Sequence, residues 1–298
     1  MGPGETDKPP PGPVREGTSL AYFRQRADER FWSRQWAETS LADLLAVAEV
    51  SAITRFLERH VQRGRRVVEG GCGLGQYVAY FHRQGVRIVG VDYSDSALAA
   101  HRASFPESDL CRADLTDLPF DDQSFDVYIS LGVIEHYDDC GRAILAEAQR
   151  VLADDGCLLL STPYLNYSRR LLRTAIERRQ AAIAAAGGDF YQYAFREGAL
   201  DGILEDAGFS VRERSYYDPG RGLRDVGALR ARRTGATRVG GGKPAVRGPL
   251  PAQRGRLAQS LLYSGPSLRA FAHMQIVSAC KRRTRARRDA REGRSVRA

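Results

Sequence analysis

The sequence has few of the residues that tie a fold together covalently or through a metal. Its 298 residues include five cysteines, an odd number, and no Cys-x-x-Cys pair. This usage argues against a disulfide framework and a zinc site, and it favours a reducing compartment. Each cysteine is expected to be a small buried hydrophobe. No metal is predicted either, because adjacent acids such as Asp138 and Asp139 are usually solvated loop residues.

Long apolar runs are also missing. No stretch approaches the length that a bilayer-spanning helix requires. Residues 1–18 are rich in Gly and Pro, without the apolar stretch of a signal peptide. We therefore expect a cytoplasmic protein in which residues 1–18 form a disordered leader. The hydrophobic fraction of 43% is enough for a sizeable core.

The net charge of +9 is unevenly distributed along the chain. Residues 221–256 hold ten Lys and Arg against one Asp, and residues 281–298 hold nine against two acids. The rest of the chain therefore has a net charge of −7. We interpret this as a mildly acidic body with a basic Gly/Arg-rich insertion at 217–270 and a basic disordered tail at 281–298. Nucleic-acid binding is disfavoured, although the tail is compatible with weak phosphate attraction.

From residue 58 onward, short apolar runs alternate with helical segments, which predicts an α/β fold with a doubly wound sheet. This core is expected over 58–216, with a cap insertion at 165–196 and a final strand at 271–280. Residues 19–57 are expected to be helical, with Thr39 and Ser40 between two helices. The predicted core strands are 66–69, 86–91, 109–113, 125–130, 156–161, about 209–214 and 272–279, with helices between them that include 143–151 and 197–207.

A glycine-rich turn, Glu69-Gly70-Gly71-Cys72-Gly73-Leu74-Gly75, follows the first predicted strand. Glycine lets a ligand approach the backbone closely, and the next helix offers free N–H groups at its start. A dinucleotide fingerprint, Gly-x-Gly-x-x-Gly, counted from Gly71 would require glycine where the chain has Gln76. The spacing therefore disfavours a nicotinamide cofactor.

Acidic residues end the next two predicted strands. Asp92 comes 23 positions after Glu69, where a carboxylate can accept hydrogen bonds from both ribose hydroxyls. Asp114 ends the third strand. Because the carboxyl ends of parallel strands open onto one crevice, we expect these three acids to face the same ligand.

Together these motifs resemble the class I S-adenosylmethionine-dependent methyltransferases, in their small-molecule, type 11-like branch. The turn with its preceding acid is similar to the first motif of that family, Glu/Asp-x-Gly-x-Gly-x-Gly. Val91-Asp92-Tyr93-Ser94 resembles the second motif and Ala113-Asp114-Leu115 the third. The resemblance covers about residues 60–163 and includes the segments 118–120, 124–128, 133–136, 148–152 and 155–156. It implies a Rossmann-like seven-stranded sheet with an antiparallel last strand, and S-adenosylmethionine as cofactor, released as S-adenosylhomocysteine.

The same resemblance implies roles for individual residues. Glu69, Gly71 and Gly73 would line the methionine and ribose part of the cofactor, and Asp92 would hold the ribose hydroxyls. Tyr93 would pack on adenine, Asp114 would accept from its amino group, and Leu115 would offer a backbone N–H. The remaining cofactor-binding candidates are Gln76, which begins the helix after the turn, and Leu131, which would border the methionine moiety.

His136 is the candidate catalytic base, because it follows the fourth strand on the substrate side and its side chain titrates near neutral pH. The alternative that Glu135 and His136 only shape the turn stays open. Acceptor recognition is expected from the N-terminal aromatic residues Tyr22, Phe23, Trp32 and Trp36 and from the 165–196 insertion. Such an aromatic cover suits a small molecule, methylated on oxygen or nitrogen by in-line displacement.

Two other functions stay open. An RNA or protein methyltransferase would use the basic insertion and tail to grip its substrate, although Ser130-Leu131-Gly132-Val133 stands where amino-methylating nucleic-acid enzymes have Asn/Asp-Pro-Pro-aromatic. A non-catalytic scaffold would bind S-adenosylmethionine without methyl transfer. The leading hypothesis is the small-molecule methyltransferase.

Overall fold

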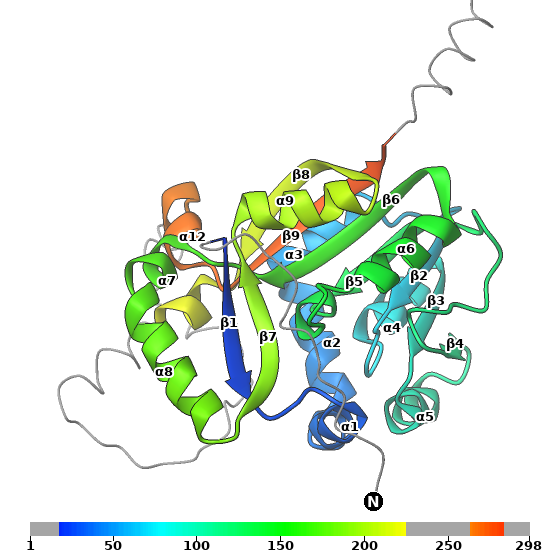
Figure 1. Ribbon diagram of the computed structural model, residues 1–298. Helices are drawn as coiled ribbons and strands as arrows, with labels where there is room; N and C mark the ends of the chain where they lie inside the picture. The colour runs from blue at the N-terminus through cyan, green and yellow to red at the C-terminus, as the bar shows by residue number, and fades with distance from the viewer. Residues whose placement is uncertain (1–17, 225–262, 283–298) are drawn as a thin grey trace, which may run out of the picture.

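The structure is a computed structural model, and it describes residues 18–224 and 263–282 (Figure 1). All but the last residue of the predicted leader, most of the basic insertion and nearly all of the basic tail lie outside these residues. The described parts of the chain contain no helix long and apolar enough to cross a membrane.

A seven-stranded sheet forms the centre of the fold, in the order β4-β3-β2-β5-β6-β9-β8. The strands β4, β3, β2, β5 and β6 are parallel to one another, whereas β9 is antiparallel to both β6 and β8. The doubly wound, Rossmann-like α/β sheet with an antiparallel last strand is thereby confirmed. Its strands are β2 (Arg66–Gly70), β3 (Arg87–Asp92), β4 (Asp109–Arg112), β5 (Phe125–Leu131), β6 (Leu152–Pro163), β8 (Phe209–Tyr217) and β9 (Met274–Lys281).

Helices cover both faces of the sheet because successive side chains along a strand point to opposite sides. In β6, Leu158 and Leu160 pack with α6 (Arg142–Val151) and α9 (Glu197–Asp206) on one face. Leu159, between them, belongs to the opposite core. That core includes side chains of α3 (Ala52–Glu58), α4 (Gln76–His82) and α5 (Asp95–Ser104).

Serine side chains cap the starts of two helices, and one of them is the predicted Ser40. Ser40 accepts a hydrogen bond from the Asp43 backbone N–H at the start of α2 (Leu41–Val50). Ser94 accepts one from the Ala97 N–H at the start of α5. Each cap satisfies a backbone donor that the helix itself leaves unpaired.

A second, two-stranded sheet corrects the prediction for the N-terminal segment. β1 (Ser19–Arg24) pairs antiparallel with β7 (Asp189–Phe195), so the helical prediction for residues 19–57 is wrong at its start. Residues 19–24 bury Leu20 against Ala194 and the side chain of Ile176, a contact that only a partner far along the chain supplies. The helical part of residues 19–57 consists of α1 (Glu29–Ala37), α2 and α3.

The predicted cap insertion at 165–196 is part helix and part strand. It contains α7 (Tyr167–Leu171), α8 (Arg173–Ala185) and β7. Figure 1 shows β1 and β7 as a ribbon beside α8, next to the central sheet. The last described helix is α12 (Gly265–Phe271), which leads into β9.

Candidate active site

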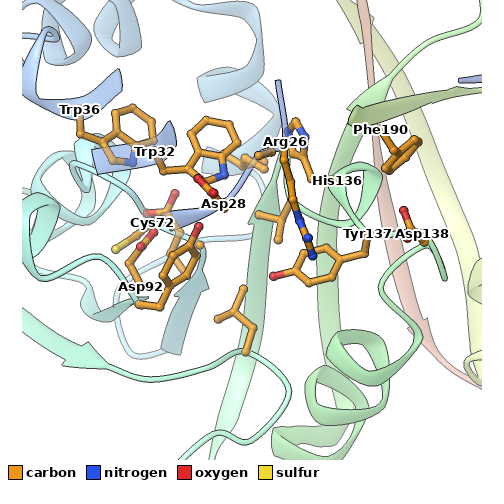
Figure 2. A pocket seen from close by; sticks show the side chains of 18 of the residues that line it. Arg26, Asp28, Trp32, Trp36, Cys72, Asp92, His136, Tyr137, Asp138 and Phe190 are labelled. Atoms are coloured by element: carbon orange, nitrogen blue, oxygen red, sulfur yellow. The ribbon is translucent and has the colours of Figure 1, made fainter. Parts of the chain in front are cut away.

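A cavity of about 730 Å³ opens at the carboxyl ends of the parallel strands. Its lining comes from the glycine turn and the end of β3, from the segment 131–138 after β5, and from residues 26–36 with the start of β7. Figure 2 shows Cys72 and Asp92 on one side of the cavity and His136, Tyr137 and Phe190 on the other. The volume falls within the range of small-molecule sites, about 300–1,000 Å³.

The glycine turn is fastened to the end of β3 by backbone hydrogen bonds. The N–H groups of Gly71 and Cys72 donate to the Val91 carbonyl oxygen at 2.8 and 3.0 Å. Gly71 and Gly73 have φ angles of +75° and +55°, a conformation that favours glycine. A Cβ on Gly73 would also lie 2.4 Å from the indole ring of Trp36. The turn therefore needs glycine at both positions.

Asp92 lies at the centre of this side of the cavity and is only 6% exposed. Its Oδ2 accepts from the Gly73 N–H at 2.8 Å, and its Oδ1 accepts from the Ser94 N–H at 2.9 Å. Burial raises the pKa of the carboxyl group, while these backbone donors oppose the increase. Since a carboxylate oxygen accepts two hydrogen bonds, each oxygen retains capacity for a ligand hydroxyl.

Two further acceptors on this side have no protein partner. The side-chain atoms Glu69 Oε2 and Gln76 Oε1 are buried and make no hydrogen bond within the described residues. Both residues line the cavity. Burial raises the pKa of Glu69 to about 8, and the nearby Asp92 adds to the increase. Because buried acceptors are normally satisfied, this pair fits a ligand that donates hydrogen bonds.

Of the other predicted cofactor residues, some line the cavity and two do not. Tyr93, Leu115 and Leu131 line the cavity beside Gly71. Gly73 is not among the lining residues and contributes through its bond to Asp92. Asp114 is exposed and also lies outside the lining, and its Oδ1 accepts at 2.8 Å from both the backbone N–H and the hydroxyl of Thr116.

His136 lies on the opposite side of the cavity, at the end of the 3₁₀ helix η1 (Ile134–His136). Its Nδ1 is 2.7 Å from the carbonyl oxygen of Tyr191. A carbonyl only accepts, so Nδ1 carries the proton and Nε2 retains its lone pair. Burial lowers the pKa of His136 to about 4, which leaves the ring neutral at neutral pH.

Aromatic rings cover His136 and the glycine turn. Trp32 lies edge-on to His136 with ring centroids 5.1 Å apart, and it stacks on Trp36 at 5.8 Å. Trp36 in turn contacts Gly73. One face of α1 therefore spans both sides of the cavity (Figure 2).

Several lining residues are absent from the sequence-based prediction. Arg26, Asp28 and Tyr137 line the cavity but were not named as site residues, whereas Phe190 lies in the 165–196 insertion that was expected to recognise the acceptor. Arg26 and Asp28 follow β1, and Phe190 belongs to β7. Two aromatic-rich segments, 19–24 and 189–195, could have indicated these residues, because the segments pair as strands beside the cavity. Within residues 18–224 and 263–282, no group of three His, Cys, Asp or Glu side chains is arranged to hold a metal ion.

Similar proteins bear out the motif analysis. Residues 68–160 match a family described as a methyltransferase domain. The chain is 32% identical over 169 residues to a "Probable S-adenosylmethionine-dependent methyltransferase" of Mycolicibacterium smegmatis, covering 57% of this chain and 61% of that protein. It is 32% identical over 194 residues to a "Putative methyltransferase" of Encephalitozoon cuniculi, covering 62% and 89%. It is 28% identical over 169 residues to a "Probable tRNA methyltransferase 9B" of Homo sapiens, covering 56% and 35%.

The chain thus spans less than two thirds of the length of the M. smegmatis relative. Among solved structures, an S-adenosylmethionine-dependent methyltransferase of Archaeoglobus fulgidus matches with a TM-score of 0.51 and 15% identity, over 85% of this chain and all of that one. This likeness concerns the fold. From its motifs, its sheet and these relatives, the chain belongs to the class I S-adenosylmethionine-dependent methyltransferases.

Proposed function

We propose that the protein transfers a methyl group from S-adenosylmethionine to an oxygen or nitrogen of a small-molecule acceptor. The observation that carries the proposal is that one cavity joins the unpaired acceptor atoms Glu69 Oε2 and Gln76 Oε1 to the neutral imidazole of His136. A donor site and an acceptor site in one cavity are what an in-line displacement requires.

The residues on the glycine-turn side fit the cofactor. Glu69 and Gln76 would accept hydrogen bonds from its ammonium group, and Asp92 would accept from its ribose hydroxyls. When bound, S-adenosylmethionine supplies an electrophilic methyl group on a sulfonium. Gly71, Tyr93, Leu115 and Leu131 are proposed to line the same site, and Gly73 to support it through its hydrogen bond to Asp92. The proposed adenine contact of Asp114 would use the oxygen that Thr116 leaves free.

On the other side, His136 is proposed to accept the proton that the attacking group loses. The Tyr191 carbonyl fixes the tautomer, so Nε2 is the basic atom. A base of low pKa suffices for an oxygen acceptor, because an oxygen that has gained a methyl group before losing its proton is strongly acidic. For a nitrogen acceptor, the same lone pair can accept a hydrogen bond that orients the attacking atom.

α1 is proposed to exclude water from the reaction. Trp32 and Trp36 place two large rings over the junction between the two sides of the cavity. Holding the reacting atoms together without water can supply much of the rate enhancement of such a displacement. No residue needs to form a covalent intermediate.

The test is an acceptor screen that measures S-adenosylhomocysteine release from the full chain with metabolite pools and, separately, with bulk tRNA. Turnover on a metabolite fraction, with none on tRNA, is expected. Cofactor binding in calorimetry without turnover on either pool would instead support the non-catalytic scaffold.

A tRNA acceptor is the second candidate, favoured by the human relative named as a tRNA methyltransferase and by the basic segments. It predicts turnover on tRNA that declines when residues 283–298 are deleted and when salt is raised. That result would replace the small-molecule proposal while leaving the cofactor site intact.

A further inference from the structure

Two of the free cysteines stand opposite each other in neighbouring strands. Cys157 of β6 and Cys280 of β9 are direct partners in the antiparallel register of the central sheet. Directly opposed residues in such a pair have Cα atoms about 4.5–5.5 Å apart. Disulfides span Cα separations of about 4.4–6.8 Å, so the Cα separation expected of an opposed pair lies within the range of a disulfide. Both lie outside the lining of the cavity.

A guanidinium group lies against Cys280. Arg212 Nε donates a hydrogen bond to Cys280 Sγ at 2.8 Å, from a point in β8 where the register with β9 shifts. A positive donor stabilises the charge on sulfur when it reacts as a thiolate. Cys280 is partly exposed and Arg212 is exposed, so a small oxidant can reach this sulfur.

Cys157 has a different environment. Its Sγ is 3.2 Å from the hydroxyl of Ser278 and 4.0 Å from Nδ1 of His60. Burial raises the pKa of the Cys157 thiol, so it remains protonated. Burial also lowers the pKa of His60, whose neutral ring can accept a proton and whose Nε2 lies 3.6 Å from Glu213 Oε2.

We propose that Cys280 and Cys157 form an oxidation site at which a hydroperoxide converts the two thiols into a disulfide that joins β9 to β6. The Cys280 thiolate attacks one peroxide oxygen, so that an S–O bond forms while the O–O bond breaks. The other oxygen leaves as water or an alcohol after taking a proton. Cys280 is now a sulfenic acid.

The second step closes the disulfide. Cys157 passes its proton to His60 and attacks the Cys280 sulfur, so that an S–S bond forms and the S–O bond breaks. The hydroxide leaves as water after taking a proton from His60. In sum, two thiols are oxidised and one peroxide is reduced.

Cys111 provides a matched comparison because it is partly exposed as well. Its partner in the adjacent strand β3 is Val91, not a cysteine. Cys72 and Cys140 are buried. The structure therefore predicts that oxidation selects one pair among five thiols.

The experiment treats the reduced full chain with hydrogen peroxide, blocks the remaining thiols with iodoacetamide and maps the peptides by mass spectrometry. We expect a Cys157–Cys280 cross-linked peptide, the loss of two free thiols per chain and full reversal by dithiothreitol. Cys157→Ala is expected to leave a sulfenic acid on Cys280 that dimedone traps. Cys111→Ala is expected to oxidise like the unchanged protein.

Arg212→Gln keeps both thiols and alters only an exposed side chain, so it tests the chemistry without threatening the fold. It should slow disulfide formation about tenfold, as expected when a cationic neighbour of a reactive thiol is removed. Equal oxidation of Cys111 and Cys280, or no cross-link in the unchanged protein, would overturn the proposal. An unchanged rate in Arg212→Gln would overturn the role of the guanidinium.

Discussion

The two sides of the cavity are built in different ways. The cofactor side comes from strand ends and one short turn, and backbone N–H groups of Gly71, Cys72 and Gly73 fix it to β3. The acceptor side is assembled from segments far apart in the chain, and it is held largely by ring contacts such as that between Trp32 and His136. Backbone hydrogen bonds specify one geometry, whereas ring packing tolerates exchange of side chains. The geometry of the proposed cofactor side is therefore fixed by the backbone, whereas the geometry of the proposed acceptor side depends on side-chain packing.

The strongest test of this division is His136→Gln. Loss of the basic Nε2 should lower kcat about 10²–10⁴-fold on the acceptor found in the screen, the range that a general base contributes. The cofactor Kd should remain unchanged, since His136 lies on the other side of the cavity. His82→Gln in α4, outside the cavity lining, is the control and should match the unchanged protein. A large change in cofactor Kd would show that the two sides are not separable.

Asp92→Ala should have the largest effect on the cofactor side. It removes the acceptor for Gly73 and Ser94 and both proposed ribose contacts, about 3 kcal/mol in all. Calorimetry should therefore show a cofactor Kd about 100-fold higher. Asp114→Ala removes at most one proposed contact and should raise Kd about fivefold.

Asp95→Ala is the control for both substitutions, because Asp95 is exposed and pairs only with Arg112 among the described ion pairs. Its cofactor Kd should not change. If Asp114→Ala raises the cofactor Kd as much as Asp92→Ala does, Asp114 must take a less exposed position when the cofactor is bound.

The pKa of Glu69 makes cofactor binding depend on pH. Burial raises this pKa to about 8, so the free protein holds Glu69 protonated below that value, whereas the proposed contact with an ammonium group requires the carboxylate. Kd should therefore fall as pH rises from 6 to 8, by up to about tenfold per unit, and level off above 8. Glu69→Gln should remove the dependence.

Glu135→Gln provides the matched comparison. Burial raises the pKa of Glu135 to about 8 as well, but this residue does not line the cavity. The variant should keep the pH dependence of cofactor binding. Should Glu135→Gln flatten the curve and Glu69→Gln leave it steep, the assignment of Glu69 to the ammonium group is wrong.

The smallest effects are expected from substitutions of the stacked tryptophans. One substitution should change the cofactor Kd and the other the acceptor KM. Trp36 contacts Gly73, so Trp36→Phe should raise the cofactor Kd about fivefold with little change in the acceptor KM. Trp32 contacts His136, so Trp32→Phe should raise the acceptor KM by a similar factor and leave the cofactor Kd alone. Equal effects of both variants on both constants would contradict the division.

The division also explains how much the sequence could predict. The core strands and the glycine turn follow from local apolar runs and from spacing, and the structure contains each of them within a few residues. The strand β1 could not be predicted from local patterns. Its pairing with β7 depends on residues about 170 positions away, and its aromatic residues are equally compatible with a helix face. Arg26, which follows β1, was missed for that reason.

The same limit applies to the thiols. Cys157 and Cys280 are 123 positions apart in the sequence, so their spacing predicts no relation between them. They become neighbours because β9 inserts between β6 and β8, and only the register shows that the two cysteines are opposed.

The indole stack has a practical consequence. The chain has two tryptophans in all, and both line the cavity. Light absorbed selectively by indole is therefore absorbed only at the site, and a ligand that enters beside the stacked rings changes the surroundings of every tryptophan in the molecule. The protein carries its own optical reporter, and the change in its emission can follow occupancy of the cavity in real time and without a label.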